Sequence, residues 1–198
     1  MRILLFPLHY SYMQLYYRHL PHHYAIGEPL FVTFRLYGSL PIGRVFPARH
    51  LTSGKALACM DRLLDEQRAG PAYLRMPAVA ELVADAIGQG ADSAYLLHTW
   101  VVMPNHVHLL ITPQVAVPAM LRRLKGSSAR ECNKLLGQTG RPFWQDESYD
   151  RLVRNADEFH RIQSYILQNP VRAGLVRSAE EYPWSSISRP CGLKPAAG

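Results

Sequence analysis

Apolar residues alternate with polar ones in some segments of this chain and recur at helical spacing in others, and together these patterns predict an α+β domain. Residues 31–37, 94–102 and 106–112 are rich in β-branched, aromatic and aliphatic residues, which is typical of strands. Residues 149–154 are consistent with a further short strand. Because strands and helices do not alternate strictly, we expect a mainly antiparallel sheet with helices packed on it.

Other segments repeat apolar residues at the three- and four-residue spacing of amphipathic helices. They are residues 52–68, a stretch opened by Pro77 and closed by Gly88 and Gly90, a stretch from Pro118 to about Leu136, and a last helix that begins after Asn155. Asn155 with Glu158 three residues later resembles a capping box, and Pro170 disfavours helical geometry at Asn169. The buried stripe of the third helix is expected at Leu121, Leu124, Ser128, Cys132 and Leu135.

Composition and charge narrow the class of protein. The 198 residues fit one domain, and a hydrophobic fraction of 48% is enough for a core. A formal net charge of +7 favours a polyanionic partner, and the sequence has no apolar run long enough to span a bilayer. Nucleic acid is therefore a better interpretation than a membrane. The three cysteines are widely spaced without a Cys-x-x-Cys pair, so we expect a reducing compartment and a cytoplasmic protein.

A pair of histidines lies in the most apolar run of the chain. His106 and His108 flank Val107, and side chains alternate along a strand, so both imidazoles should point to one face. Two imidazoles side by side on a rigid strand form a natural half of a metal site. The same pair is also common as ordinary polar residues on a half-exposed strand, so the motif needs support from elsewhere in the chain.

The last helix carries a second candidate, Tyr165. It lies about a quarter-turn from the expected buried stripe of Phe159, Ile162 and Ile166, at the border of core and solvent. Asn169 follows it by four residues and is therefore its neighbour on the helix surface. On the helix alone, Tyr165 is equally consistent with a core-edge tyrosine whose hydroxyl meets water.

Four segments resemble one family, the single-tyrosine HUH transposases, and in particular the REP-associated, IS200-like tyrosine transposases. They are Leu30-Phe31-Val32-Thr33-Phe34-Arg35-Leu36-Tyr37-Gly38-Ser39-Leu40-Pro41, Met103-Pro104-Asn105-His106-Val107-His108-Leu109-Leu110, Phe143-Trp144-Gln145-Asp146-Glu147-Ser148-Tyr149-Asp150, and Tyr165-Ile166-Leu167-Gln168-Asn169-Pro170-Val171-Arg172-Ala173-Gly174-Leu175-Val176. The second and fourth are specific motifs. The resemblance spans roughly residues 18–186.

The resemblance implies a ferredoxin-like antiparallel sheet flanked by helices, and a DNA nicking and joining enzyme. His106 and His108 would bind a divalent ion, Mg²⁺ or Mn²⁺, and Tyr165 would attack single-stranded DNA near a hairpin to form a 5′-phosphotyrosine. Related transposases have a glutamine ligand four residues after the tyrosine. Here that position holds Asn169, whose amide can still ligate although its arm is one methylene shorter.

Further expectations concern DNA contacts and boundaries. The candidate DNA-binding residues are Arg18, His19, Arg122, Arg123, Arg130, Lys134, Arg154 and Arg172. We expect an N-terminal arm at residues 1–27, a single transposase domain at 28–186 and a C-terminal tail at 187–198. The oligomeric state stays open between monomer and homodimer.

Three alternatives compete with this interpretation. A non-catalytic protein could retain the fold and bind hairpin DNA without cleaving it. A metal-dependent hydrolase could combine His106 and His108 with Asp146, Glu147 or Asp150 and leave no protein–DNA link. A replication initiator or relaxase of the same HUH type is a third alternative, although such chains are usually larger.

Overall fold

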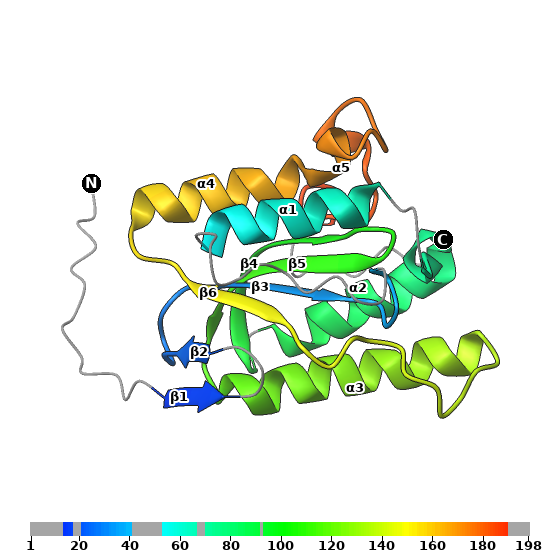
Figure 1. Cartoon of the computed structure of the whole chain (residues 1–198), viewed down its shortest axis with the longest axis horizontal. Helices are drawn as coiled ribbons and strands as arrows, with labels where there is room; N and C mark the ends of the chain where they lie inside the picture. The colour runs from blue at the N-terminus through cyan, green and yellow to red at the C-terminus, as the bar shows by residue number, and fades with distance from the viewer. Residues whose placement is uncertain (1–13, 18–20, 41–52, 67–69, 92, 190–198) are drawn as a thin grey trace.

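A four-stranded antiparallel sheet forms the centre of the molecule, with helices on both faces, as the sequence predicts (Figure 1). The computed structural model describes residues 14–17, 21–40, 53–66, 70–91 and 93–189. The sheet has the strand order β4-β5-β3-β6. Its strands are β3 (Leu30–Arg35), β4 (Tyr95–Val102), β5 (His106–Pro113) and β6 (Tyr149–Leu152).

The connections between these strands follow the ferredoxin-like pattern. After β3 the chain passes through α1 (Ser53–Asp65) and α2 (Pro77–Gly90) before it reaches β4 at the far edge. A tight turn joins β4 to β5, and α3 (Val117–Leu135) returns the chain to the other edge at β6. The remaining elements are β1 (Gln14–Tyr17), β2 (Pro21–Tyr24), η1 (Tyr73–Arg75), α4 (Ala156–Leu167), α5 (Asn169–Arg172) and η2 (Ala179–Glu181).

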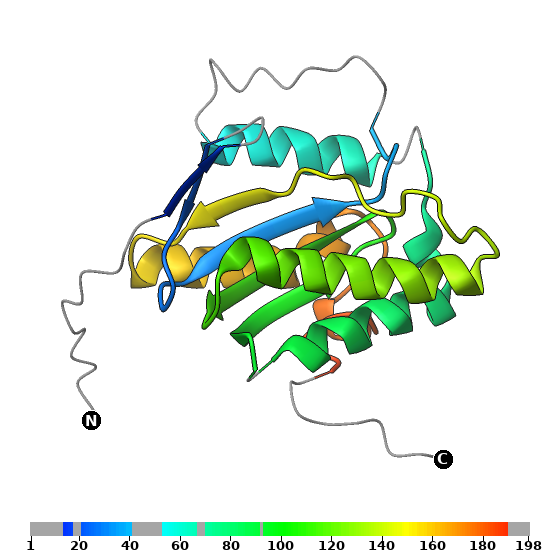
Figure 2. The ribbon, with the colours of Figure 1, turned by 90° about the horizontal axis from the view of Figure 1, so that it is seen from below.

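The two faces of the sheet are covered by different helices (Figures 1 and 2). We call the face under α2 and α3 the apolar face, and the face under α1 and α4 the histidine face. Because side chains alternate along a strand, Val107 and Leu109 join the core beneath α2 and α3. Phe31 and Leu110 lie on the other side and pack with Ile166 of α4.

The apolar face holds the larger core. Val79, Val83 and Ile87 of α2 are at most 1% exposed and pack with β3, β4 and β5. On α3, Leu121, Leu124, Ser128 and Cys132 are buried as predicted. Leu135 is 51% exposed, so its inclusion in the buried stripe was wrong. It is the last residue of α3, and the next residue, Leu136, packs against the core in its place.

The termini of α4 and α2 show how local sequence sets the helix limits. Asn155 caps α4 as predicted, since its side chain accepts the backbone N–H of Glu158 at 2.9 Å. The Glu158 carboxylate accepts the N–H of Arg154 instead of the N–H of Asn155, so the reciprocal bond of a capping box is displaced by one residue. At the other helix, α2 continues through Gly88 and ends at Gly90.

Residues 182–186 cover the β4 edge of the sheet. The N–H of Val102 donates to the carbonyl of Trp184, and the N–H of Ser186 donates to the carbonyl of Trp100. The Tyr182 hydroxyl donates to the Val102 carbonyl at 2.8 Å. These bonds satisfy strand groups that an open edge would expose. In the part of the chain that the structure describes, no helix is both long enough and apolar enough to cross a bilayer.

Candidate metal and nucleophile site

His106 and His108 lie side by side on the histidine face of β5. Both are fully buried, and their Nε2 atoms are 3.1 Å apart. The strand pairing sets Thr33 opposite His108 and Arg35 opposite His106. The prediction that the two imidazoles share a face is therefore confirmed. Their Nε2 atoms also point toward each other.

The outer nitrogen of each ring is held by a polar neighbour. Asn105 donates from Nδ2 to the carbonyl of Leu64, so its Oδ1 is left to accept a hydrogen bond from His106 Nδ1 at 2.7 Å. A proton on Nδ1 leaves the lone pair of His106 on Nε2, where a metal ion would bind. His108 Nδ1 lies 2.7 Å from the Thr33 hydroxyl, which can donate or accept.

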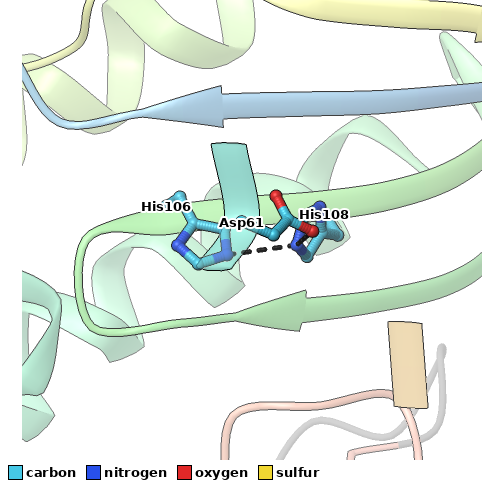
Figure 3. Close-up of side chains that lie close together, drawn as sticks. All are labelled: Asp61, His106 and His108. Atoms are coloured by element: carbon cyan, nitrogen blue, oxygen red, sulfur yellow. Dashed lines mark hydrogen bonds and ion pairs between the residues drawn. The ribbon is translucent and has the colours of Figure 1, made fainter. Parts of the chain in front are cut away.

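A carboxylate from a distant helix completes the cluster. Asp61 of α1 is 3% exposed, and its Oδ2 lies 3.3 Å from His108 Nε2 (Figure 3). One ligand atom from each of Asp61, His106 and His108 falls within 4.8 Å of the others. The other carboxylate oxygen of Asp61 is buried and has no hydrogen-bond partner among the described residues.

The electrostatics of this cluster fit a cation. Burial, followed by the charge of His108, lowers the pKa of His106 to about 3, so its imidazole is neutral at physiological pH. Burial would raise the pKa of Asp61, but the charges and hydrogen bonds of its neighbours, His108 foremost, outweigh burial and lower it to about 2. A neutral imidazole and an ionised carboxylate are the forms that ligate metals. The donor set of two nitrogens and one oxygen suits divalent transition metals.

Tyr165 of α4 lies next to this cluster. Its hydroxyl donates a hydrogen bond to Asp61 Oδ2, and its ring centroid lies 5.9 Å from that of His108. Burial, and then the negative charge of Asp61, raises the pKa of Tyr165 well above its usual range, so the phenol is neutral here. The guanidinium of Arg172 lies 3.9 Å from the centre of the phenol ring and acts in the opposite direction on the pKa.

Asn169 begins α5 and is completely buried. Among the described residues, neither its amide oxygen nor its amide nitrogen has a hydrogen-bond partner. A buried amide without a partner costs free energy, and such groups are typical of sites that bind a ligand. Its role as third ligand stays a prediction, because the three groups that the structure brings together are Asp61, His106 and His108.

The predicted DNA-contact residues divide between the two faces. Arg122, Arg123, Arg130 and Lys134 are exposed on α3, over the apolar face, and Arg130 pairs with Glu131 at 3.4 Å. Arg154 is exposed and lies 3.4 Å from the Glu158 carboxylate. Among the described members of this set, Arg172 is the one that contacts Tyr165. Arg18 and His19 lie outside the described residues.

Sequence reasoning missed Asp61, and with it the contribution of α1. The available signal was an acidic residue inside the apolar stripe of the predicted helix at 52–68, three residues before Leu64. The carboxylates expected for the hydrolase alternative do not join the cluster, and Asp146 and Glu147 line a pocket beneath α3 instead. Asp65, one turn after Asp61, shares a second pocket with Tyr165 and Arg172.

Comparison with known proteins finds similarity to one group of transposases. The model of the IS200-like transposase family matches residues 80–169, which include both histidines, Tyr165 and Asn169. The chain is homologous to the IS200-like transposases. It is 25% identical over 101 residues to a REP-associated tyrosine transposase of Escherichia coli, covering 50% of this chain. It is 39% identical over 74 residues to the ISDra2 transposase TnpA of Deinococcus radiodurans, covering 34% of this chain.

The matched regions are partial, and a solved structure extends the comparison of folds. The alignments span 58% and 53% of the lengths of these two relatives. A solved REP-associated tyrosine transposase bound to a REP hairpin superposes with a TM-score of 0.51 at 19% identity, covering 94% of this chain and 92% of that one. This likeness confirms the expected fold. Asp61 precedes the segment matched by the family model.

Proposed function

We propose that this IS200-like transposase homologue cleaves and rejoins single-stranded DNA near a hairpin through a covalent bond to Tyr165. The observation that carries the proposal is the hydrogen bond from the Tyr165 hydroxyl to Asp61, the same carboxylate that pairs with His108. A nucleophile, a carboxylate and two imidazoles thus converge on one buried point. Nucleophilic catalysis requires such a group to be held next to the charges that activate it.

The three groups Asp61, His106 and His108 would hold a divalent ion, with Asn169 as a candidate additional ligand. The bound ion would supply positive charge at the scissile phosphate and would offset the Asp61 charge that now raises the Tyr165 pKa. Imidazole ligands favour Mn²⁺ over Mg²⁺, so we expect Mn²⁺ to support the reaction at least as well as Mg²⁺.

Tyr165 acts as the nucleophile. Its phenolic oxygen forms a bond to the scissile phosphorus, the bond from phosphorus to the 3′ oxygen breaks, and Asp61 is placed to accept the phenolic proton. The departing 3′ oxygen takes up a proton and leaves as a hydroxyl. One phosphodiester replaces another, so the reverse reaction rejoins a strand without a nucleotide cofactor. Arg172 over the ring fixes the phenol and favours its ionised form.

Two observations support DNA as the substrate class: the net charge of the chain and its similarity to a DNA-bound protein. A net charge of +7 suits DNA, and a solved relative with the same fold is bound to a REP hairpin. Single-stranded DNA at the foot of a hairpin would present a backbone phosphate between unpaired nucleotides to Tyr165. The other function that the same fold could serve is hairpin binding without cleavage.

The test is a search for the covalent adduct. Purified protein is incubated with Mn²⁺ and a pool of labelled oligonucleotides that carry imperfect palindromes with randomised flanks, and adducts are separated on a denaturing gel. We expect an adduct with the wild type that disappears in Tyr165→Phe and in chelator. Tyr149→Phe is the matched control, because Tyr149 is a partly buried tyrosine on the same face that contacts Phe31. Hairpin binding by the wild type without any adduct would favour the non-catalytic module.

A further inference from the structure

Arg35 ends β3 on the histidine face of the sheet. Along this strand Phe31 stacks on His108, and the hydroxyl of Thr33 bonds the same ring. Arg35 follows at the same two-residue period, and Phe34 between them packs into the apolar face. The strand pairing sets Arg35 directly opposite His106. Directly paired residues of antiparallel strands have Cβ atoms about 5 Å apart, so Arg35 begins next to a proposed metal ligand.

The charge of Arg35 has no counterion in the part of the chain that the structure describes. Its Nη1 donates a hydrogen bond to the hydroxyl of Ser39 at 3.3 Å, and Ser39 is itself 2% exposed. Burial lowers the pKa of Arg35, and no acidic group among the described residues offsets this effect. A guanidinium offers five N–H donors, so most of its hydrogen-bonding capacity is unused.

The other partly buried arginines of the described residues behave differently. Arg151 is ion-paired with the buried carboxylate of Glu158. Arg189 forms a two-pronged pair with Glu81, with N–O distances of 2.6 and 2.7 Å. The remaining described arginines are exposed, so water can compensate their charge. Arg35 is therefore the described arginine that is withdrawn from water without an anion beside it.

An uncompensated cation that is partly withdrawn from water costs free energy, and an anionic ligand would recover that cost. The planar fork of a guanidinium matches the two free oxygens of a phosphodiester. We propose that Arg35 binds a backbone phosphate of the single-stranded DNA adjacent to the phosphate that Tyr165 attacks. This inference rests on the proposed function and adds a positioning residue from a strand to the groups supplied by α1, β5 and α4.

The position of Arg35 explains what such a contact achieves. Tyr165 approaches the cluster from α4, and Arg35 flanks His106 on the neighbouring strand β3. The scissile phosphate would lie at the ion site and the adjacent phosphate at Arg35. Both positions are set by strands of the same rigid sheet. Fixing the neighbouring phosphate aligns the scissile one for in-line attack, which is a contribution of orientation and not of bond chemistry.

The experiment measures binding separately from chemistry. Labelled oligo(dT) is titrated at several NaCl concentrations with proteins that all carry Tyr165→Phe, so no adduct forms. Arg35→Gln should weaken binding about tenfold, as expected for a lost charge-assisted contact. The slope of log affinity against log salt should fall by about 0.7, the value for one phosphate of a single strand. Arg35→Lys should keep the slope but recover the affinity only in part, because an ammonium lacks the fork.

Arg177→Gln is the control, since Arg177 is exposed and its loss changes the net charge by the same amount. It should leave the salt slope unchanged. A structural role for Arg35 would instead lower the melting temperature of Arg35→Gln without altering the slope, and that result overturns the inference. If the wild type forms the Tyr165 adduct while Arg35→Gln retains the full slope, the inference fails and the proposed function stands. If oligo(dT) does not bind at all, the inference fails, and the proposed function is decided separately by the adduct assay on hairpin oligonucleotides.

Discussion

The two faces of the central sheet are built from the same strands but hold very different side chains. On the apolar face, Val107 and Leu109 are fully buried among the residues of α2 and α3. On the histidine face, the residues next to them in sequence, His106 and His108, meet a carboxylate and a phenol. Strand alternation thus separates stability from chemistry within one short segment, and a register shift of one residue would exchange the two.

The faces also differ in how well their polar groups are satisfied. On the histidine face, one carboxylate oxygen each of Asp61 and Asp65 and the amide of Asn169 have no hydrogen-bond partner among the described residues. On the apolar face, the indole of Trp144 donates to the Ser128 hydroxyl, which in turn donates to the carbonyl of Leu124. The exception on α3 is Asn133, whose amide oxygen has no partner among the described residues. Buried polar groups without partners cost stability, which proteins tolerate mainly where a ligand will bind.

The largest expected effect concerns stability on the apolar face. Phe34→Ala should lower the free energy of unfolding by about 3–5 kcal/mol, because Phe34 is 1% exposed and packs edge-on against Trp144. Urea denaturation measures this loss, and calorimetric titration with Mn²⁺ measures ion affinity below the transition. The affinity of the folded protein should be unchanged. A parallel loss of ion affinity would show that the two faces are not separate.

The complementary change on the histidine face should affect ion binding more than folding. Asp61→Asn keeps the shape of the side chain but removes its charge, so Mn²⁺ affinity should fall by more than about a hundredfold, beyond the usual effect of a group that only supports a ligand. The melting temperature of the ion-free protein should fall less than that of Phe34→Ala, although the ion pair with His108 is lost. Unchanged affinity in the same titration would remove Asp61 from the proposed ligand set.

A smaller effect should appear in the pH dependence of stability. Burial, and then the charge of Asp61, raises the pKa of Asp65 from 3.8 to about 6. The folded protein therefore binds the proton more tightly than the unfolded chain between these values, and stability falls as the pH rises through that window. Asp65→Asn removes this penalty. Its melting temperature should exceed that of the wild type above pH 6, and the difference should vanish below pH 3.8. A difference that is the same at both ends of the window would refute this origin.

The smallest effect is expected from the cations of α3. Arg123 and Arg130 are exposed over the apolar face, on the other side of the sheet from Tyr165. Neutralising both to glutamine should weaken DNA binding at low salt, where long-range attraction is least screened, and leave the rate of adduct formation at saturating DNA unchanged. A slower rate at saturation would place DNA contacts of the reacting strand on the apolar face.

Local patterns in the sequence predicted most of the fold and three of the four groups that the structure brings together, His106, His108 and Tyr165. The strand at 106–112 and the helix after Asn155 follow from spacing and capping within a few residues, so His106, His108 and Tyr165 could be assigned to elements before the structure. Asp61 could not be placed in the same way. Its contact with His108 depends on how α1 packs across the sheet, which no pattern within the helix specifies.

Long-range packing also explains the errors. The periodicity of α3 continues to Leu135, but the helix ends there and the core contact passes to Leu136, so Leu135 is exposed. The cations of α3 were predicted to contact DNA because the chain is basic; the topology puts α3 on the other face of the sheet from Tyr165, and their contact with DNA stays a prediction. Arg35 belongs to the first of the four family-like segments, but the sequence assigned it no role. Only the strand pairing sets it opposite His106.

The central claim is that groups from α1, β5 and α4 form one metal-organised centre around the Tyr165 hydroxyl. The most direct measurement is a crystal structure of the protein with Mn²⁺, in which anomalous scattering locates the ion. The account predicts a single strong peak bounded by Asp61, His106 and His108, with the Tyr165 hydroxyl beside it. An ion bound elsewhere, or histidines that stay bonded to each other at saturating Mn²⁺, would contradict it.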